Sequence, residues 1–322
     1  MTRTRVLIAR AKNPKGLFYR PGPALAERLV AELNLELVRS PDDDPHLILG
    51  TSPGSFIKAY RDVPDRSRVK KILIAFGQKS FIDPTAKGYR LRHAHCYDLA
   101  DRIIVWNQTQ KDILISFGVA EKKISILPLY LPNTSDDSAS SLDDQLVFKS
   151  LLLSPDRPTY LIVLDPTNRE QRSAARSIVR MMPFSQFISA GDFPLSKPQR
   201  TTIDEKENLS NLRIMPELRE EMVSSLLKKV KAVICLDEYA VDAPLFNDFI
   251  ARKIPFLSVE LRFFKDTYIP NNDFIPVSLN TIKTYETIKN ISTSTIPEKA
   301  FKRLKERAES NPLAPLKSLL NR

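Results

Sequence analysis

Glycine is scarce in this sequence. Eight glycines occur in 322 residues, and only Gly191 follows Gly118. Glycine-rich phosphate-binding loops need several glycines, because the backbone must approach the ligand closely and adopt positive φ. A loop of that kind is excluded from the second half of the chain. An anion site there has to rely on helix amino termini and cationic side chains.

Cysteine and long apolar runs are also scarce. The two cysteines, Cys96 and Cys235, are far apart and lack metal-ligand spacing, which excludes a disulfide framework and a zinc site; we expect both to be inert packing residues. No apolar run reaches 18 residues, and MTRTRVLIARAK at the start does not have the pattern of a signal peptide. We therefore expect a cytoplasmic protein.

Positive charge exceeds negative charge mainly in the first half of the chain. The net charge is +11, and residues 1–133 hold 22 basic and 13 acidic side chains, a surplus of nine. Residues 58–92 alone hold ten basic and three acidic side chains. This asymmetry indicates an anionic partner such as a phospholipid surface, an anionic glycan carrier or nucleic acid, unless it serves solubility alone.

Short apolar runs rich in β-branched residues alternate with segments of helical period, which is typical of parallel α/β architecture. In the first half we expect strands at 5–9, 35–39, 46–50, 71–76, 102–106 and 123–128. In the second half we expect strands at 159–165, 184–191, 211–216, 231–237 and 254–259. The length of the chain favours two domains.

The segment between the two series begins with serine and aspartate clusters and ends with two prolines, which indicates a linker. We therefore divide the chain into a first Rossmann-like domain, a linker, a second Rossmann-like domain and a C-terminal helical segment. Their limits are 1–133, 134–158, 159–280 and 281–322.

The stretch ADRIIVWNQTQKDILISFGVAEKKISILPLYLPN at 100–133 predicts a strand, a helix, an FGV turn and a second strand. Gly118 follows a helix expected to bury Ile113, Leu114 and Phe117, where a residue with positive φ ends a helix well. Thr109 is a candidate N-cap for this helix.

This order of elements resembles the last strand-helix-strand unit of the first domain in GT-B glycosyltransferases, especially the large family of retaining enzymes that use nucleotide sugars (glycosyltransferase family four-like). The resemblance covers most of residues 5–260. It implies two Rossmann-like domains that face each other across a cleft. It further implies transfer of a hexose-like sugar from a nucleotide-sugar donor to an acceptor hydroxyl, without a metal or other cofactor.

The donor positions of this family fall on altered residues here. Asp165 and Glu170 stand where the family has a diphosphate-binding arginine and lysine, so Arg169 and Arg172 are the candidate replacements. Further on, Asp248, expected just ahead of the helix that begins with FIARK, matches the carboxylate that binds the ribose. The other family carboxylate matches Glu238 or Asp242 only with a shift.

The resemblance places the transferred sugar and the acceptor near the first domain. Phe76 replaces the family histidine before Gly77, which leaves Gln78 as the nearest polar substitute. Gly16, in the loop after the first strand, and Ser52 and Gly54, after the third, follow strand ends, where open α/β sheets bind ligands. No catalytic residue is assigned. The candidate cleft residues are therefore Gly16, Ser52, Gly54, Gly77 and Gln78.

Three functions remain open at this point. The first is a glycosyltransferase acting on a lipid- or glycan-linked acceptor, held peripherally at an anionic membrane surface or to an anionic acceptor by the first domain. The second is a non-catalytic GT-B-like scaffold that binds a partner, since Phe76, Asp165, Glu170 and the missing glycines all depart from the family. The third, for which no aromatic and basic RNA-binding motif appears, is a glycosyltransferase acting on nucleic-acid bases.

Overall fold

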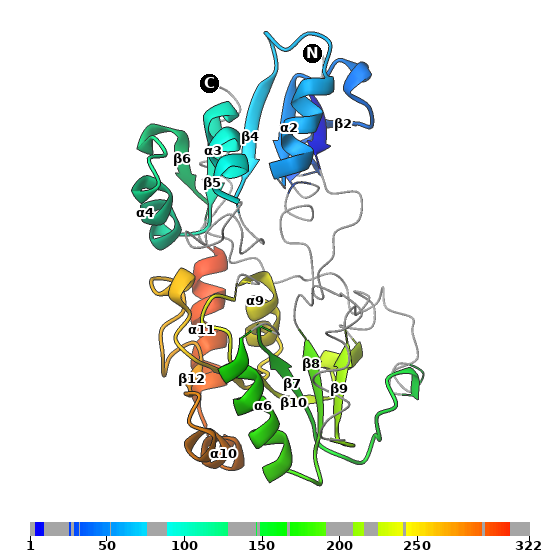
Figure 1. The fold of residues 1–322 in the computed structure, drawn as a ribbon, viewed down its shortest axis with the longest axis vertical. Coiled ribbons are helices and arrows are strands. Elements are labelled where there is room, and N and C mark those ends of the chain that lie inside the picture. The colour runs from blue at the N-terminus through cyan, green and yellow to red at the C-terminus, as the bar shows by residue number, and fades with distance from the viewer. Residues whose placement is uncertain are drawn as a thin grey trace. The chain divides into compact units, whose positions relative to one another are not determined.

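The structure is a computed structural model of the chain. It describes residues 4–9, 26, 29–31, 33–51, 53–75, 89–127, 146, 149–165, 168–190, 209–215, 225–240, 243–291 and 294–309. The chain forms two compact units. Among the described residues, the first unit holds everything up to Leu127, and the second holds residues 146–309. Each unit is built on one parallel six-stranded sheet (Figure 1), which confirms the predicted α/β class. The domain limits expected from the sequence stay predictions.

The first sheet has the strand order β2-β1-β3-β4-β5-β6. Its strands are Arg5–Ala9 (β1), Glu36–Val38 (β2), Leu47–Gly50 (β3), Lys70–Ile74 (β4), Arg102–Val105 (β5) and Ile124–Ile126 (β6). Helices Pro53–Asp62 (α2), Tyr89–Leu99 (α3) and Gln108–Ser116 (α4) connect successive strands from β3 onward. All six lie where the apolar runs of the sequence predict strands.

The ends of α4 correct the sequence analysis in part. Asn107 is the N-cap: its side chain accepts a hydrogen bond from the N–H of Gln110, and Thr109 lies inside the helix. Gly118 has φ +85° after the C-cap, as predicted. Of the three residues expected to be buried, however, only Leu114 is fully buried, and Phe117 is 41% exposed.

The second sheet has the strand order β12-β11-β10-β7-β8-β9. Its strands are Thr159–Val163 (β7), Gln186–Ala190 (β8), Leu212–Met215 (β9), Val230–Cys235 (β10), Phe256–Ser258 (β11) and Ile275–Pro276 (β12). The helices whose full bounds are described are Arg169–Met181 (α6), Ala243–Ala251 (α9), Thr281–Lys289 (α10) and Ile296–Glu309 (α11), with a 3-10 turn at Arg262–Phe264 (η4). Strand β12, an edge strand of two residues that includes a proline, is not predicted by the sequence pattern.

The core of the second unit has two layers of side chains, one on each face of the sheet. On one face α6 and α10 pack side by side (Figure 1), and Ala174, Ala175 and Ile178 of α6 are buried among residues of β7, β8 and β10. The other layer contains α9, which packs against α11 and β11. Phe246 of α9 lies there at the centre of an aromatic cluster with ring centroids at 4.8 Å from Phe256 and 5.8 Å from Tyr268.

A buried carboxylate connects α11 to the segment before β12. Asp273 is 3% exposed, and its Oδ2 accepts hydrogen bonds from the N–H of Ile269 at 2.8 Å and from Nη1 of Arg303 at 2.5 Å. Nη2 of Arg307 lies 3.9 Å from the same oxygen. Burial raises the pKa of Asp273 above its ordinary value, while the hydrogen bond from Ile269 and the two arginines oppose that rise.

Both cysteines are fully buried, and neither forms a disulfide, as expected. Burial raises the pKa of the Cys96 thiol to about 12, so the nucleophilic thiolate is not populated at neutral pH. Cys96 is therefore a packing residue of α3.

Candidate functional site

The strand orders point to one candidate ligand position in each unit. In an open α/β sheet, ligands bind beyond the carboxyl ends of the strands, at the point where the strand order changes direction. In the first sheet this point lies between β1 and β3, and in the second it lies between β7 and β10. We therefore expect a ligand site, if one is present, at the loops that follow these four strands, and call these two positions the switch points of the sheets.

The turn after β7 brings the amino end of α6 to the carboxyl edge of the second sheet. Asn168 caps the helix: its side-chain oxygen accepts hydrogen bonds from the N–H groups of Glu170 and Gln171 at 3.0 and 3.2 Å. The Gln171 side chain in turn accepts a hydrogen bond from the N–H of Asp165 at 2.7 Å. These bonds fix the turn, so the positive end of the helix dipole stands at the predicted ligand position.

Two predicted arginines lie in the first turn of α6. Arg169 is exposed, and Arg172 is half-buried. The Nε of Arg172 is buried, and no described residue accepts a hydrogen bond from it. An unpaired buried donor costs on the order of 1–3 kcal/mol. The Nε atoms of Arg176 and Arg213 are unsatisfied in the same way, and an anionic ligand within reach of the Arg172 guanidinium would supply its missing acceptor.

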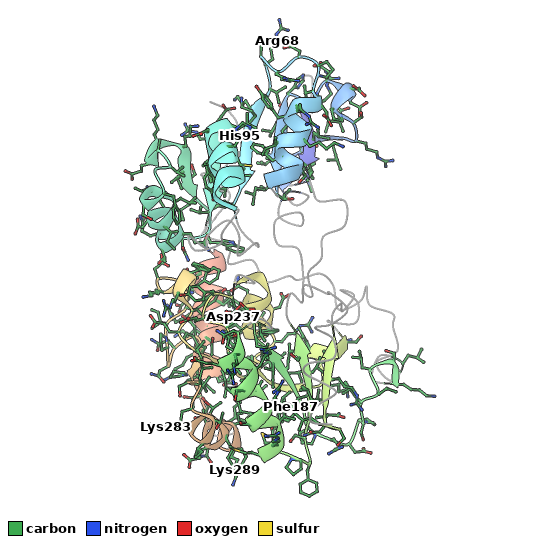
Figure 2. All side chains as sticks on the ribbon, in the orientation of Figure 1. Arg68, His95, Phe187, Asp237, Lys283 and Lys289 are labelled. Atoms are coloured by element: carbon green, nitrogen blue, oxygen red, sulfur yellow. The ribbon has the colours of Figure 1, made fainter. Side chains whose placement is uncertain are left out.

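The strand next to β7 delivers acidic residues to the same edge. The N–H of Leu236, just after β10, donates to the carbonyl of Val163 at 2.8 Å, so the two strand ends stay paired. Asp237, labelled in Figure 2, then turns the chain by accepting a hydrogen bond from the N–H of Tyr239 at 3.0 Å. Glu238, a predicted donor-binding residue, lies in this turn, one strand away from Asp165.

Glu238 belongs to a cluster that the sequence analysis does not anticipate. Its Oε2 lies 2.8 Å from Nε of Arg262 in η4, the turn after β11. The same guanidinium donates from Nη1 to the hydroxyl of Tyr239 at 2.9 Å and lies 5.1 Å from the centre of the Tyr239 ring. The backbone N–H of Arg262 also donates to the carbonyl of Glu238 at 2.9 Å. The turns after β10 and β11 are thus held together by four contacts.

The other two predicted carboxylates are placed differently. Asp248 lies inside α9, which begins at Ala243, and not ahead of the helix as the sequence analysis expects. Its side chain is half-buried. Asp242 lies outside the described residues. The structure therefore brings Arg169, Arg172 and Glu238 to the switch point of the second sheet and puts Asp248 in the second turn of a neighbouring helix.

In the first unit, the described part of the candidate site is the start of α2. The Thr51 side chain and the Ser55 side chain each donate to the carbonyl of Ala9, the last residue of β1, at 3.3 Å. These bonds hold the first turn of α2 at the switch point between β1 and β3. Gly54 is exposed in that turn. The remaining predicted cleft residues, Gly16, Ser52, Gly77 and Gln78, lie outside the described residues.

Two glycines near this turn allow a matched test. A Cβ on Gly50 would lie 2.2 Å from Cδ2 of Phe56, whose ring is fully buried, whereas a Cβ on Gly54 would meet nothing within 4 Å. We expect Gly50→Ala to lower the free energy of unfolding by about 1–3 kcal/mol through overpacking. Gly54→Ala is expected to be neutral or to stabilise by less than about 1 kcal/mol, because alanine favours the helix.

Urea unfolding of both variants measures this difference. If Gly54 faces a bound ligand, Gly54→Ala should weaken binding or activity without loss of stability. A Gly50→Ala variant as stable as the unmodified chain would contradict the close packing of Phe56 on the end of β3.

Comparison with known proteins identifies the fold. No family model and no curated protein sequence matches the chain. Among solved structures, sucrose-phosphate synthase of Thermosynechococcus elongatus is 12% identical, with a TM-score of 0.60 over 98% of this chain and 88% of that one. HepE of Anabaena in complex with UDP-glucose is 9% identical, with a TM-score of 0.65 over 95% of each chain.

The UDP-GlcNAc 2-epimerase of Methanocaldococcus jannaschii has the same fold at 11% identity, with a TM-score of 0.52 over 95% of this chain and 99% of that one. The fold is therefore GT-B glycosyltransferase-like, as the resemblance of residues 100–133 predicts. At these identities the likeness establishes the fold, and the function has to be argued from the site.

Within the residues that the structure describes, no helix is both long enough and apolar enough to cross a membrane. The same residues contain no group of three or more histidine, cysteine, aspartate or glutamate side chains placed to hold a metal ion.

Proposed function

We propose that the chain is a glycosyltransferase that moves a sugar from a nucleotide-sugar donor to an acceptor hydroxyl, with the donor bound at the carboxyl edge of the second sheet. The observation that carries this proposal is the pair of turns at the switch point between β7 and β10. One presents a helix amino terminus with two arginines, and the other presents Glu238. The similarity to HepE, which is bound to UDP-glucose, supports a uridine nucleotide as the first donor to test.

Each group has a role in the proposed reaction. The acceptor oxygen forms a bond to the anomeric carbon while the bond from that carbon to the diphosphate breaks, and the proton of the acceptor hydroxyl passes to the leaving diphosphate oxygen. Negative charge therefore develops on the leaving diphosphate. The amino end of α6, Arg169 and Arg172 are placed to stabilise that charge. Glu238 accepts hydrogen bonds from sugar hydroxyls, and Asp242 and Asp248 are the proposed further donor contacts.

Thermal unfolding with added nucleotides tests the donor site. A ligand that binds only the native state raises its stability by RT ln(1 + [L]/Kd), which is about 2.7 kcal/mol at 100 times Kd. We expect the midpoint to rise by several degrees with one of UDP, GDP and ADP or their sugars. Arg172→Gln should remove most of that rise, since it deletes a charged donor to the phosphates.

Arg180→Gln is the matched control, because Arg180 lies in the last turn of the same helix and is exposed. Asp248→Ala, measured in parallel, tests whether that carboxylate contacts the nucleotide. The absence of a shift with every nucleotide at millimolar concentration would contradict the proposal.

A non-catalytic scaffold is the second candidate, and one specific observation favours it. Asp165 in the turn after β7 and Glu170 in the first turn of α6 put two carboxylates where the family resemblance expects cations. The same nucleotide panel separates the two candidates, since a scaffold without a donor site gives no shift. For a chain that does bind UDP-sugars, analysis of the products distinguishes transfer to an acceptor from epimerisation of the sugar.

The acceptor is proposed to be lipid- or glycan-linked and anionic. Lys58, Arg61 and Arg68 of the first unit have side chains that are 58%, 70% and 90% exposed, and Arg68 projects from the loop between α2 and β4 (Figure 2). Their charge, which Asp62 and Asp65 within 4.0 Å offset only in part, suits an anionic membrane surface or glycan, and nucleic acid is a less supported alternative. Sedimentation with vesicles containing phosphatidylserine, at low and high salt, tests the membrane partner: equal recovery with neutral vesicles would contradict it.

A further inference from the structure

The cluster of Arg262, Glu238 and Tyr239 has hydrogen-bonding capacity that its own contacts do not use. A guanidinium carries five N–H donors in a planar fork. In Arg262, Nε faces Glu238 and one Nη1 hydrogen faces the Tyr239 hydroxyl. No other described residue accepts a hydrogen bond from this side chain, which is 52% exposed. The Nη2 side of the fork is thus available to a ligand.

The fork is also held in one orientation. The Glu238 carboxylate fixes one edge of the guanidinium, the Tyr239 hydroxyl fixes another, and the Tyr239 ring lies beneath it. Tyr239 itself packs edge-on against Phe263, which is 3% exposed. A side chain held in this way loses little rotamer freedom on binding, whereas an isolated surface arginine loses much more.

The cluster lies on the sheet edge where the donor site has acidic residues in place of the expected cations. The turn after β7 contains Asp165, and Glu170 follows in the first turn of α6. Arg262 follows β11, two strands away from β7 on the same edge of the sheet, and its backbone is bonded to the turn after β10. It therefore brings a cation to the edge where the leaving diphosphate is expected.

We propose that Arg262 is a phosphate-binding residue of the donor site, oriented by Glu238 and Tyr239. This inference rests on the proposed function, because it assigns a residue to the site that binds the nucleotide diphosphate. The guanidinium contacts the diphosphate through its Nη2 edge while Glu238 keeps its hold on Nε. Arg262 thereby supplies, from the far side of β10, the charge that Asp165 and Glu170 do not supply.

Calorimetric titration with UDP, together with NMR detection of uridine binding, tests the assignment. Arg262→Gln is expected to lower the affinity for UDP about tenfold or more, because a charge-assisted hydrogen bond to phosphate is lost. Its affinity for uridine should stay unchanged, because uridine has no phosphate. Tyr239→Phe, which keeps the ring and loses the hydroxyl, should give a smaller loss for UDP and none for uridine.

Lys265→Gln is the matched control. Lys265 directly follows η4, is 56% exposed and pairs with Glu260 at 3.3 Å. It is therefore a cation of similar exposure, paired with a glutamate but without the contact to Tyr239 that orients Arg262. UDP affinity in this variant should equal that of the unmodified chain. Equal affinity of Arg262→Gln and the unmodified chain for UDP would overturn the inference and leave the proposed function standing. A parallel loss of uridine binding would also overturn it, because it would indicate a structural role. Failure of the unmodified chain to bind any nucleotide would overturn both.

Discussion

Replacement of Arg303 by alanine is expected to lower the free energy of unfolding of the second unit by about 3 kcal/mol at neutral pH, the cost of leaving a buried carboxylate without its main partner. Asp273 is 2% exposed at its side chain, and Arg303 is its nearest cation, while Arg307 lies 3.9 Å away. The hydrogen bond from Ile269 remains in the variant but does not neutralise the charge.

The pH dependence of this loss has a definite sign. Burial already raises the pKa of Asp273 in the folded chain, so the folded state binds this proton more tightly than the unfolded state. The contribution of Asp273 to stability is therefore full below its unfolded pKa and is lost as the pH rises through the folded pKa. Removal of Arg303 raises the folded pKa further. The difference between Arg303→Ala and the unmodified chain should thus shrink as the pH is lowered from neutrality through the folded pKa of the variant.

Urea unfolding across this pH range measures the effect, and Lys302→Ala is its control. Lys302 is the preceding residue of α11, is 81% exposed and approaches Glu306 only at 4.0 Å, so its loss should cost less than about 0.5 kcal/mol. A double variant of Arg303→Ala with Asp273→Asn should recover part of the stability and lose the pH dependence. A constant deficit at every pH would show that Arg303 acts through packing alone.

Replacement of Phe246 by alanine is expected to destabilise the second unit by about 3–5 kcal/mol, the usual cost of removing a buried phenylalanine ring. The ring is fully buried and packs on four other aromatic rings, of which Phe256 is stacked at 4.8 Å and Tyr268 lies edge-on at 5.8 Å. Phe246 lies one turn before Ile250 on α9, the helix that also carries Asp248. The cavity left by the ring would therefore also weaken the packing of α9 against the sheet.

Phe184→Ala is the matched control for this substitution, since Phe184 is 85% exposed and its loss should change stability by less than about 0.5 kcal/mol. Chemical denaturation quantifies both variants. If UDP binds the native state, added UDP should partly offset the loss of stability in Phe246→Ala. A Phe246→Ala variant within 1 kcal/mol of the unmodified chain would contradict the packing described for α9.

The sequence predicts most strands because buried parallel strands leave continuous apolar runs, as in RVLIA and TYLIV. Strand β12 is missed because two residues, one of them proline, are too short to form a pattern. The cap of α4 is misplaced because Asn107 and Thr109 are both good capping residues, and only the backbone geometry separates them. The start of α9 is misplaced because the sequence analysis places it at FIARK, although Asp242 and Pro244 are residue types that favour a helix start at Ala243.

The candidate site is harder to predict from the sequence than the strands are. Arg169 and Arg172 are found because they follow a clear strand and open a helix. The pairing of Glu238 with Arg262 is not found, because the two residues lie in different turns and meet only when β10 and β11 pair. The sequence does contain one indication that Arg262 lies near the site. Arg262 follows the predicted strand at 254–259, and ligands of open α/β sheets bind just beyond the carboxyl ends of the strands.

The short edge strand of the second sheet bears on self-association. An exposed sheet edge can recruit a strand from another molecule, and long apolar edges lead to aggregation. Strand β12 offers an incoming strand only Ile275 and Pro276, and the proline has no N–H to donate. At the β12 edge, the second sheet therefore gives a neighbouring copy little to pair with, even when the protein is concentrated.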